Sequence, residues 1–283
     1  MPMKGPAKLL LFAVVLAGVF GVSYAVGSAL DPVGMAQSEN GDDGAHGGAG
    51  DEPHTPPGLA VADDGFRIVT STTSLRVGSA TAFAFEILDD DGRVVREFDV
   101  EHTKRMHLIV VRRDLSQFVH LHPELDQQGA WVTDLTVDAP GTYRAFADFA
   151  VDGEKHTLGV DLFAPGEVAP EAIRASSRTV DAGDGYSATL AGEAVAGEES
   201  TLSFQIHRRG EPVSHLPHYL GAAGHLVVLR AGDLAFLHVH PETDRLAFDA
   251  EFPTAGTYAL YLQFDSCDGV RTARFVIDVE DAG

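Results

Sequence analysis

One segment of this chain occurs twice, at residues 106–124 and again at residues 224–242. In each copy the second histidine lies 13 positions after the first, and the third histidine lies 15 positions after the first. The Asp-Leu pair between them is shifted by one position, since it begins at Asp114 in one copy and at Asp233 in the other. The loop changed while the histidine spacing stayed the same, which indicates that the distance between the imidazoles matters. The chain therefore has to fold into two similar units.

The first copy has the pattern of an antiparallel hairpin. Residues 108–111 are apolar and mostly β-branched, as in a buried strand, and residues 118–122 alternate like a second strand. With residues 112–117 as the turn, a symmetric register would place His107 opposite His120. The second copy follows the same pattern, so the sequence predicts two such hairpins.

The three histidines of each hairpin are candidate metal ligands. Side chains two apart on a strand face the same side at about 6.5 to 7 Å, so three imidazoles can converge on one ion. Neutral imidazole suits Cu(II) and Zn(II). We therefore predict one ion per repeat, held by His107, His120 and His122 in the first repeat and by His225, His238 and His240 in the second.

Several other readings of these residues stay open. The histidines could instead hydrogen-bond to loop carbonyls, with Pro123 and Pro241 only ending the strands. Met106 could add a thioether ligand, although strand alternation turns it away from His107 and the second copy has Gly224 there. Five histidines have no counterpart in the other copy and are expected at the surface, with the last two as possible additions to the second site: His102, His156, His207, His215 and His218.

Each repeat is a run of short strands and turns without helical periodicity, which predicts an all-β fold of two tandem immunoglobulin-like β-sandwich domains. Tyr143 and Tyr258 each follow a tight turn, as at the tyrosine corner of such sandwiches. We place the repeats at residues 60–164 and 176–281, joined by a linker at 165–175. The strands expected in the first repeat are residues 66–70, 80–88, 93–99, 106–111, 118–122, 131–137, 142–150 and 157–163.

The amino terminus carries an export signal or a membrane anchor. Residues 9–30 contain no charged side chain and would span about 33 Å as a helix. Residues 1–30 are thus a signal peptide or an uncleaved anchor, and the length of the run favours the anchor. Residues 31–59 are acidic and rich in Gly and Pro, which predicts a disordered tether. The protein would then lie outside the cytoplasm, anchored or secreted. Its single cysteine, Cys267, rules out an internal disulfide.

The net charge and the motifs of the sequence argue against two classes of function, nucleic-acid binding and catalysis. A formal net charge of −22 argues against a nucleic-acid partner, because the negatively charged phosphates of a nucleic acid would repel the protein. The sequence has no nucleophile elbow outside the hydrophobic amino-terminal run, no phosphate-binding glycine loop and no zinc-protease helix motif, so we expect no enzyme and no catalytic residue. A metal-dependent hydrolase is the less favoured alternative, with Glu124 or Asp126 as its base. A structural or adhesive envelope module without metal is the other alternative.

The motifs at residues 104–115 with 118–124, and at 219–227 with 237–241, also carry a resemblance. The chain resembles exported actinobacterial proteins that contain this doubled motif, and it is distantly similar to YtkA-like and copper-resistance periplasmic β-sandwich proteins. The second similarity implies copper, with zinc as the alternative. It suggests a metal-binding protein for storage, delivery or tolerance, whose partners are the metal ion, a metal-donor or acceptor protein of the envelope, and the membrane through the amino-terminal helix.

Overall fold

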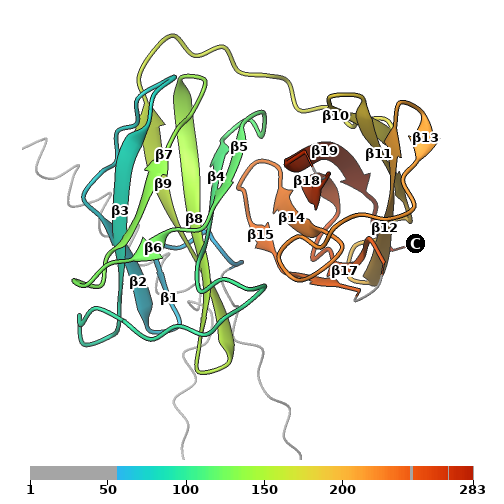
Figure 1. Cartoon of the computed structure of the whole chain (residues 1–283). Coiled ribbons are helices and arrows are strands. Elements are labelled where there is room, and N and C mark those ends of the chain that lie inside the picture. Colours follow the sequence, from blue (N-terminus) through green and yellow to red (C-terminus); the bar gives the residue numbers. More distant parts are fainter. Residues whose placement is uncertain (1–55, 243–244, 267, 283) are drawn as a thin grey trace, which may run out of the picture. The chain divides into compact units, whose positions relative to one another are not determined.

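The computed structural model describes residues 56–242, 245–266 and 268–282, which fold entirely as β-strands and connecting turns (Figure 1). The expected amino-terminal helix, the tether as far as residue 55 and Cys267 lie outside the described residues. In the described ranges no helix is long and apolar enough to cross a membrane. Residues 53–283 form one compact unit.

Each repeat contains two antiparallel sheets, which confirms the all-β expectation. In the first repeat one sheet has the order β1-β2-β3-β7-β6 and the other β5-β4-β8-β9. These strands are β1 Ala62–Asp63, β2 Phe66–Thr70, β3 Thr81–Leu88, β4 His107–Arg112, β5 Phe118–Leu121, β6 Glu124–Leu125, β7 Trp131–Leu135, β8 Gly141–Val151 and β9 Glu154–Ala164.

The second repeat has the same plan. Its sheets have the orders β10-β11-β12-β17-β16, with β13 paired to β12, and β15-β14-β18-β19. The strands are β10 Thr179–Gly183, β11 Tyr186–Ala191, β12 Glu199–Arg208, β13 Glu211–Pro212, β14 His225–Arg230, β15 Phe236–Leu237, β16 Val239–Pro241, β17 Ala247–Glu251, β18 Gly256–Asp265 and β19 Val270–Val279.

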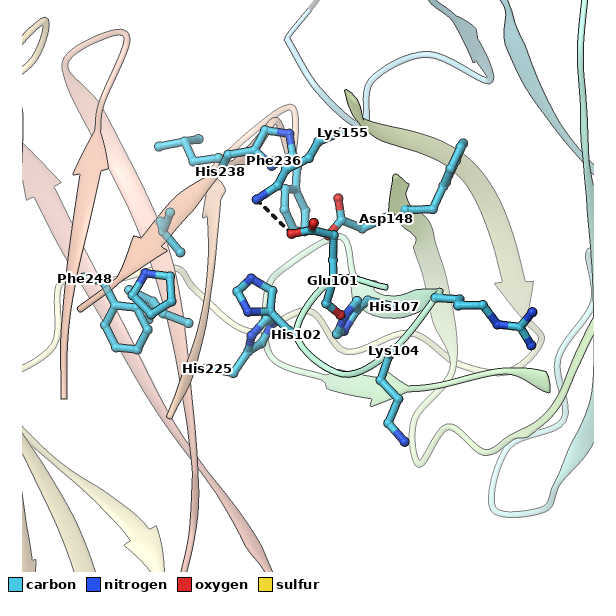
Figure 2. A pocket seen from close by; sticks show the side chains of 16 residues that line it. Glu101, His102, Lys104, His107, Asp148, Lys155, His225, Phe236, His238 and Phe248 are labelled. Atoms are coloured by element: carbon cyan, nitrogen blue, oxygen red, sulfur yellow. Dashed lines mark hydrogen bonds and ion pairs between the residues drawn. The ribbon is translucent and has the colours of Figure 1, made fainter. Parts of the chain in front are cut away.

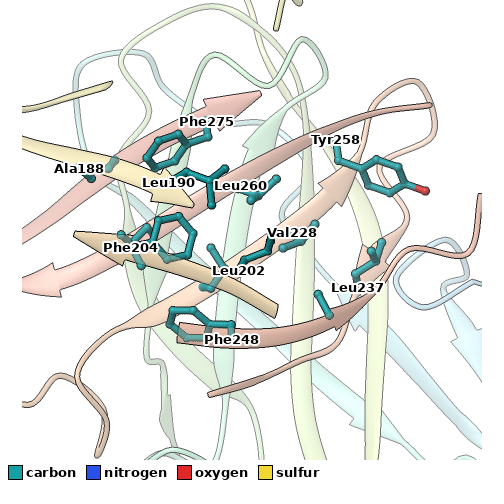
Figure 3. Packing of buried hydrophobic residues seen from close by; sticks show 14 of the residues in the cluster. Ala188, Leu190, Leu202, Phe204, Val228, Leu237, Phe248, Tyr258, Leu260 and Phe275 are labelled. Atoms are coloured by element: carbon teal, nitrogen blue, oxygen red, sulfur yellow. The ribbon is translucent and has the colours of Figure 1, made fainter. Parts of the chain in front are cut away.

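A separate apolar core lies between the two sheets of each repeat. In β3 every second side chain is buried, and Phe83 and Phe85 pack with Leu108 of β4 from the other sheet. In the second repeat Phe204 of β12 packs on Phe275 of β19 in the same way (Figure 3). This alternation is what a two-sheet sandwich requires, because one face of each strand looks inward.

Both expected tyrosine corners form. The Tyr143 hydroxyl donates to the carbonyl of Ala139 at 2.7 Å, and the Tyr258 hydroxyl donates to the carbonyl of Thr254 at 2.8 Å. Each hydroxyl bonds to backbone four residues upstream, which fixes the turn before the long strand β8 or β18.

Strand β4 is buried on both faces, and this explains its continuous apolar sequence. Leu108 and Val110 enter the core of the first repeat, whereas Ile109 and Val111 belong to a third apolar cluster together with Val227 of the second repeat. We call this third cluster the junction. It consists of Ile109, Val111, Leu115, Phe146, Val227, Leu229, Leu234, Phe236, Ala259 and Tyr261. Strand β14 has the same double burial, with Leu226 and Val228 in the core of its own repeat.

Both hairpins have the same register, but it differs from the symmetric one expected. His120 pairs with Ile109, not with His107, because Arg112 is bonded to Gln117 across a four-residue turn. Within this turn Leu115 has a φ of 63° and is fully buried in the junction. The shift of two positions preserves strand alternation, so the histidines still share the junction face.

Two further expectations differ from the structure. Residues 93–99 form no continuous strand; the backbone N–H of Val95 bonds to β3 and that of Asp99 to β8, so the segment crosses between the two sheets. The end of the predicted tether is also ordered. Gly58 bonds to the carbonyl of Thr157, and the carbonyl of Pro57 accepts from Phe236 of the second repeat.

Candidate metal centre

Three histidines from the two repeats lie together beside the junction. His107 begins β4, His120 lies in β5, and His225 begins β14. One ring nitrogen of each lies within 4.8 Å of the ring nitrogens of the other two. We call these residues the histidine trio. It draws two ligands from the first repeat and one from the second, and so differs from the separate site expected in each repeat.

Two rings of the trio are stacked and the third is tilted against both. The His107 and His225 rings are stacked at 5.5 Å with an angle of 9° between their planes. The His120 ring centre lies 5.3 Å from that of His107 and 5.0 Å from that of His225. These distances place all three rings around a common point.

Hydrogen bonds fix which nitrogens face that point. His107 Nε2–H donates to the carbonyl of Glu101 at 3.1 Å, because a carbonyl can only accept. His120 Nδ1–H donates to Oε1 of Gln263, in the second repeat, at 2.6 Å. The remaining nitrogens, Nδ1 of His107 and Nε2 of His120, lie 3.1 Å apart. In neutral rings with these tautomers both atoms carry lone pairs, and either a proton or a metal ion between them would relieve the repulsion.

Burial favours neutral rings at this position. Desolvation lowers the pKa of His120 to about 3, and the hydrogen bond that His120 donates to Gln263 only partly opposes this shift. The pKa of His107 is also lowered, mainly by burial. Burial and the neighbouring imidazoles hold the pKa of His225 well below its usual value. Because neutral imidazole is the form that binds metal, the trio is ready to coordinate an ion near neutral pH.

His122, the remaining expected ligand of the first repeat, lies against the trio. Its ring centre is 4.7 Å from that of His120 and 5.0 Å from that of His107. Its Nε2 atom is buried and has no hydrogen-bond partner among the described residues. Desolvation lowers the pKa of His122 to about 4. A buried, unpaired imidazole nitrogen beside the trio is a candidate for a fourth ligand. Its ring would have to move to take that place, because His122 does not belong to the group whose ligand atoms lie within 4.8 Å of one another.

The other two expected ligands, His238 and His240, are not part of the trio. His238 lies near the first repeat, where its Nε2 is 3.5 Å from Oγ1 of Thr157. His240 is exposed. The two repeats thus use the same three-histidine pattern differently, because His225 is turned toward the histidines of the first repeat.

His102 joins this group, although it was expected at the surface as a residue without a counterpart. Its ring centre lies 5.6 Å from that of His225 and 6.1 Å from that of His107 (Figure 2). The turn that carries it has positive φ values at His102 and Thr103, of 46° and 68°. His156, also expected at the surface, is buried against Phe66 instead.

The remaining sequence candidates have other contacts. The Met106 side chain lies in the core of the first repeat, away from the trio. A Cβ atom at Gly224, its counterpart, would come within 2.8 Å of the carbonyl oxygen of Gln263, so this position cannot carry methionine. Glu124 is exposed, Glu242 pairs with Arg245, and Asp126 accepts three backbone N–H groups of its own turn.

The buried histidines predict acid sensitivity of the metal-free protein. An unfolded histidine titrates near 6.5, whereas the pKa of folded His120 is about 3, so between these values the unfolded chain binds more protons. Stability is then complete above pH 6.5 and falls toward pH 3, by up to about 1.4 kcal/mol per pH unit for one such histidine. Thermal unfolding at pH 7, 6 and 5 should show a smaller decrease for His120→Gln than for the wild type. Equal decreases would contradict the buried, neutral state of His120.

One protein-family model matches both repeats of the chain. A family model described as a domain of unknown function (DUF8832) matches residues 60–165 and again residues 178–281. The chain belongs to this family. Each DUF8832 match contains one copy of the hairpin, so the histidine trio is built from two copies of the same family domain. No curated protein sequence matches the chain.

Solved structures show only partial likeness. FdeC, an Escherichia coli adhesin, is 12% identical over 79% of this chain and 66% of its own, with a TM-score of 0.27. Chicken CNTN1 domains FN1–FN3 are 11% identical over 80% of this chain and 66% of theirs, with a TM-score of 0.22. Escherichia coli alpha-2-macroglobulin is 13% identical over 77% of this chain and 20% of its own, with a TM-score of 0.27. No functional inference follows from these likenesses.

Proposed function

We propose that this protein is a cell-envelope module in which two β-sandwich repeats act as one rigid unit and hold a transition metal ion beside their junction. The structural part is supported by the apolar side chains of both repeats that are buried together, including Ile109, Val227 and Tyr261. The Tyr261 hydroxyl also donates to the carbonyl of Leu115 across the junction at 2.6 Å. A continuous apolar contact favours a fixed arrangement of the repeats without any ion. A purely structural or adhesive module is therefore the second candidate function.

One observation carries the metal-binding part. Two imidazole nitrogens in a partly buried contact, Nδ1 of His107 and Nε2 of His120, face each other at 3.1 Å while their other nitrogens donate to fixed acceptors. A tetrahedral ion with metal–nitrogen bonds of about 2.0 to 2.1 Å separates its ligand atoms by roughly 3.3 Å. The observed pair is close to that separation. A metal ion between the two nitrogens would replace the repulsion of their lone pairs with two coordinate bonds.

The ligand types narrow the choice of metal. Three imidazoles suit Cu(II) and Zn(II), and Met106 supplies no thioether because it lies in the apolar core. Copper is the preferred ion because of the resemblance to copper-resistance proteins, with zinc as the alternative. A three-ligand site leaves a coordination position open, which His122 or a partner's ligand can take. Such a site fits metal storage, delivery or tolerance, with a donor or acceptor protein of the envelope as its partner.

The proposed location rests on the amino-terminal sequence. The uncharged run at residues 9–30 would export the chain and anchor it in the membrane if it is not cleaved. The net charge of −22 would attract cations to a protein in that position.

A thermal unfolding experiment with added metal tests the proposal. Cu(II) or Zn(II) at 100 times its dissociation constant should stabilise the folded chain by about 2.7 kcal/mol, or roughly 5 °C or more. His120→Ala should abolish this rise, whereas the exposed His215→Ala should keep it. A rise in the wild type that His120→Ala retains would contradict the site. No rise with Cu(I), Cu(II) or Zn(II) would contradict metal binding and leave the structural module as the function.

A further inference from the structure

Residues 56–60, which we call the strap, lie at the end of the predicted tether and are hydrogen-bonded to both repeats. The backbone N–H of Gly58 donates to the carbonyl of Thr157 in β9 at 2.8 Å. The carbonyl of Pro57 accepts from the backbone N–H of Phe236 in β15 at 2.9 Å. The strap therefore bridges a strand of the first repeat and a strand of the second.

The strap is a Pro-Gly turn that packs on an aromatic pair of the junction. Gly58 has a φ of 76°, which suits glycine after proline in such a turn. A Cβ atom at Gly58 would lie 2.6 Å from the ring of Phe146 and 3.2 Å from Cβ of Phe236. The centres of these two rings lie 5.6 Å apart, and each repeat contributes one of them. No side chain fits at Gly58 while the strap is docked.

The first repeat has room for the strap at a position where the second repeat has a long side chain. A Cβ atom at Gly159 in β9 would collide with the carbonyl oxygen of Gly58. Arg274 holds the equivalent place in the pairing of β18 with β19. The backbone N–H of Gly159 also donates to the carbonyl of Ala60 at 2.8 Å. The glycine in β9 thus both makes room for the strap and bonds to it.

A buried arginine of the first repeat depends on the strap for its hydrogen bonds. Arg144 Nε donates to the carbonyl of Gly58, and Nη2 donates to the carbonyl of Leu59, both at 2.8 Å. Its Nη1 pairs with Asp161 at 2.8 Å. The equivalent residue in the second repeat is Ala259. Because a buried guanidinium needs acceptors for its N–H groups, removal of the strap would leave Arg144 without two of them.

A row of paired residues connects the strap to the trio. In the sheet β5-β4-β8-β9, His120 pairs with Ile109, and Ile109 pairs with Phe146. Phe146 in turn pairs with Gly159, which lies against the strap. Directly paired residues project on the same face of a sheet, and Ile109 and Phe146 place this face in the junction. The strap and His120 therefore lie on the same side of one sheet.

We propose that the docked strap holds the two repeats together and thereby sets how tightly the trio binds its ion. On the side of the second repeat it is bonded to β15, which pairs with β14, and β14 begins with His225. Displacement of the strap removes acceptors from Arg144 and Phe236, so the repeats separate more easily and His225 leaves the other ligands. This control of the site deepens the proposed metal binding and rests on it.

Two alanine substitutions that displace the strap test this inference in the full chain. Gly58→Ala places a methyl group against Phe146, and Gly159→Ala places one against the strap from the opposite side. Both variants should speed amide hydrogen exchange at Phe236 by about tenfold or more, because the acceptor of this N–H moves away. Both should also lower the affinity for the tight ion by about fivefold or more, measured by competition with a chelator.

Gly92→Ala is the matched control, because Gly92 has the same φ of 76° and a Cβ atom there would have nothing within 4 Å. It should change neither the exchange nor the affinity. Circular dichroism of each variant checks that the chain is folded. Strap variants that behaved like Gly92→Ala would overturn the inference, and so would faster exchange without a loss of affinity. Binding of no ion by the wild type would instead refute the trio, and with it the control by the strap.

Discussion

His225→Ala should abolish tight metal binding, although His225 belongs to the second repeat and both other ligands of the trio belong to the first. One ring nitrogen from each of the three histidines lies within 4.8 Å of those from the other two, so the variant removes one of three ligands. Losing a partner that only supports a ligand already costs about 10- to 100-fold in affinity, so losing a ligand should cost about 100-fold or more. Competition with a chelator of known affinity measures the effect.

The matched control uses the same motif at a position outside the trio. His240 is the third histidine of the second copy, but it is exposed, and His240→Ala should leave the affinity for the ion of the trio unchanged. A model with a separate site in each repeat predicts the opposite pattern, in which His225→Ala and His240→Ala each affect only one of two equal ions. An unchanged affinity for the tightly bound ion in His225→Ala would therefore refute the shared site.

Val111→Asp should separate the two repeats and remove the metal site without altering a histidine. Val111 is fully buried in the junction and points away from the core of its own repeat. An unpaired carboxylate there costs several kcal/mol unless the junction opens to water. Opening would move His225 away from His107 and His120. Small-angle X-ray scattering should show a larger radius of gyration, and titration should show loss of the tight ion.

Val69→Asp is the control for this variant, because Val69 lies on β2 of the same repeat and is 40% exposed. It should change neither the scattering nor the metal affinity. Circular dichroism of Val111→Asp should stay near that of the wild type, because both sandwiches are expected to remain folded. If that variant kept its compact scattering and its tight ion, the apolar junction would not be what positions the trio.

The repeated hairpins and the tyrosine corners were predictable because their signals are local. A run such as residues 108–111 specifies a buried strand, and a tyrosine after a tight turn specifies where a long strand begins. The register of the hairpin could not be predicted from the sequence pattern. It depends on Leu115 taking a positive φ so that its side chain enters the junction, which the alternation of polar and apolar residues does not encode.

The composition of the trio depends on a contact between repeats that no local pattern specifies. The unbroken apolar runs of β4 and β14 did contain a signal, since strands buried on both faces lose their alternation. They do not identify what covers the second face. Gln263, which orients His120, was missed because it lies within the long strand β18 without a recognisable motif.

Elemental analysis of the full chain after metal loading and gel filtration tests the shared site most directly. We predict one tightly retained ion per chain for the wild type, and none for either His120→Ala or His225→Ala. Two equally retained ions, of which each variant loses only one, would contradict an ion held between the repeats.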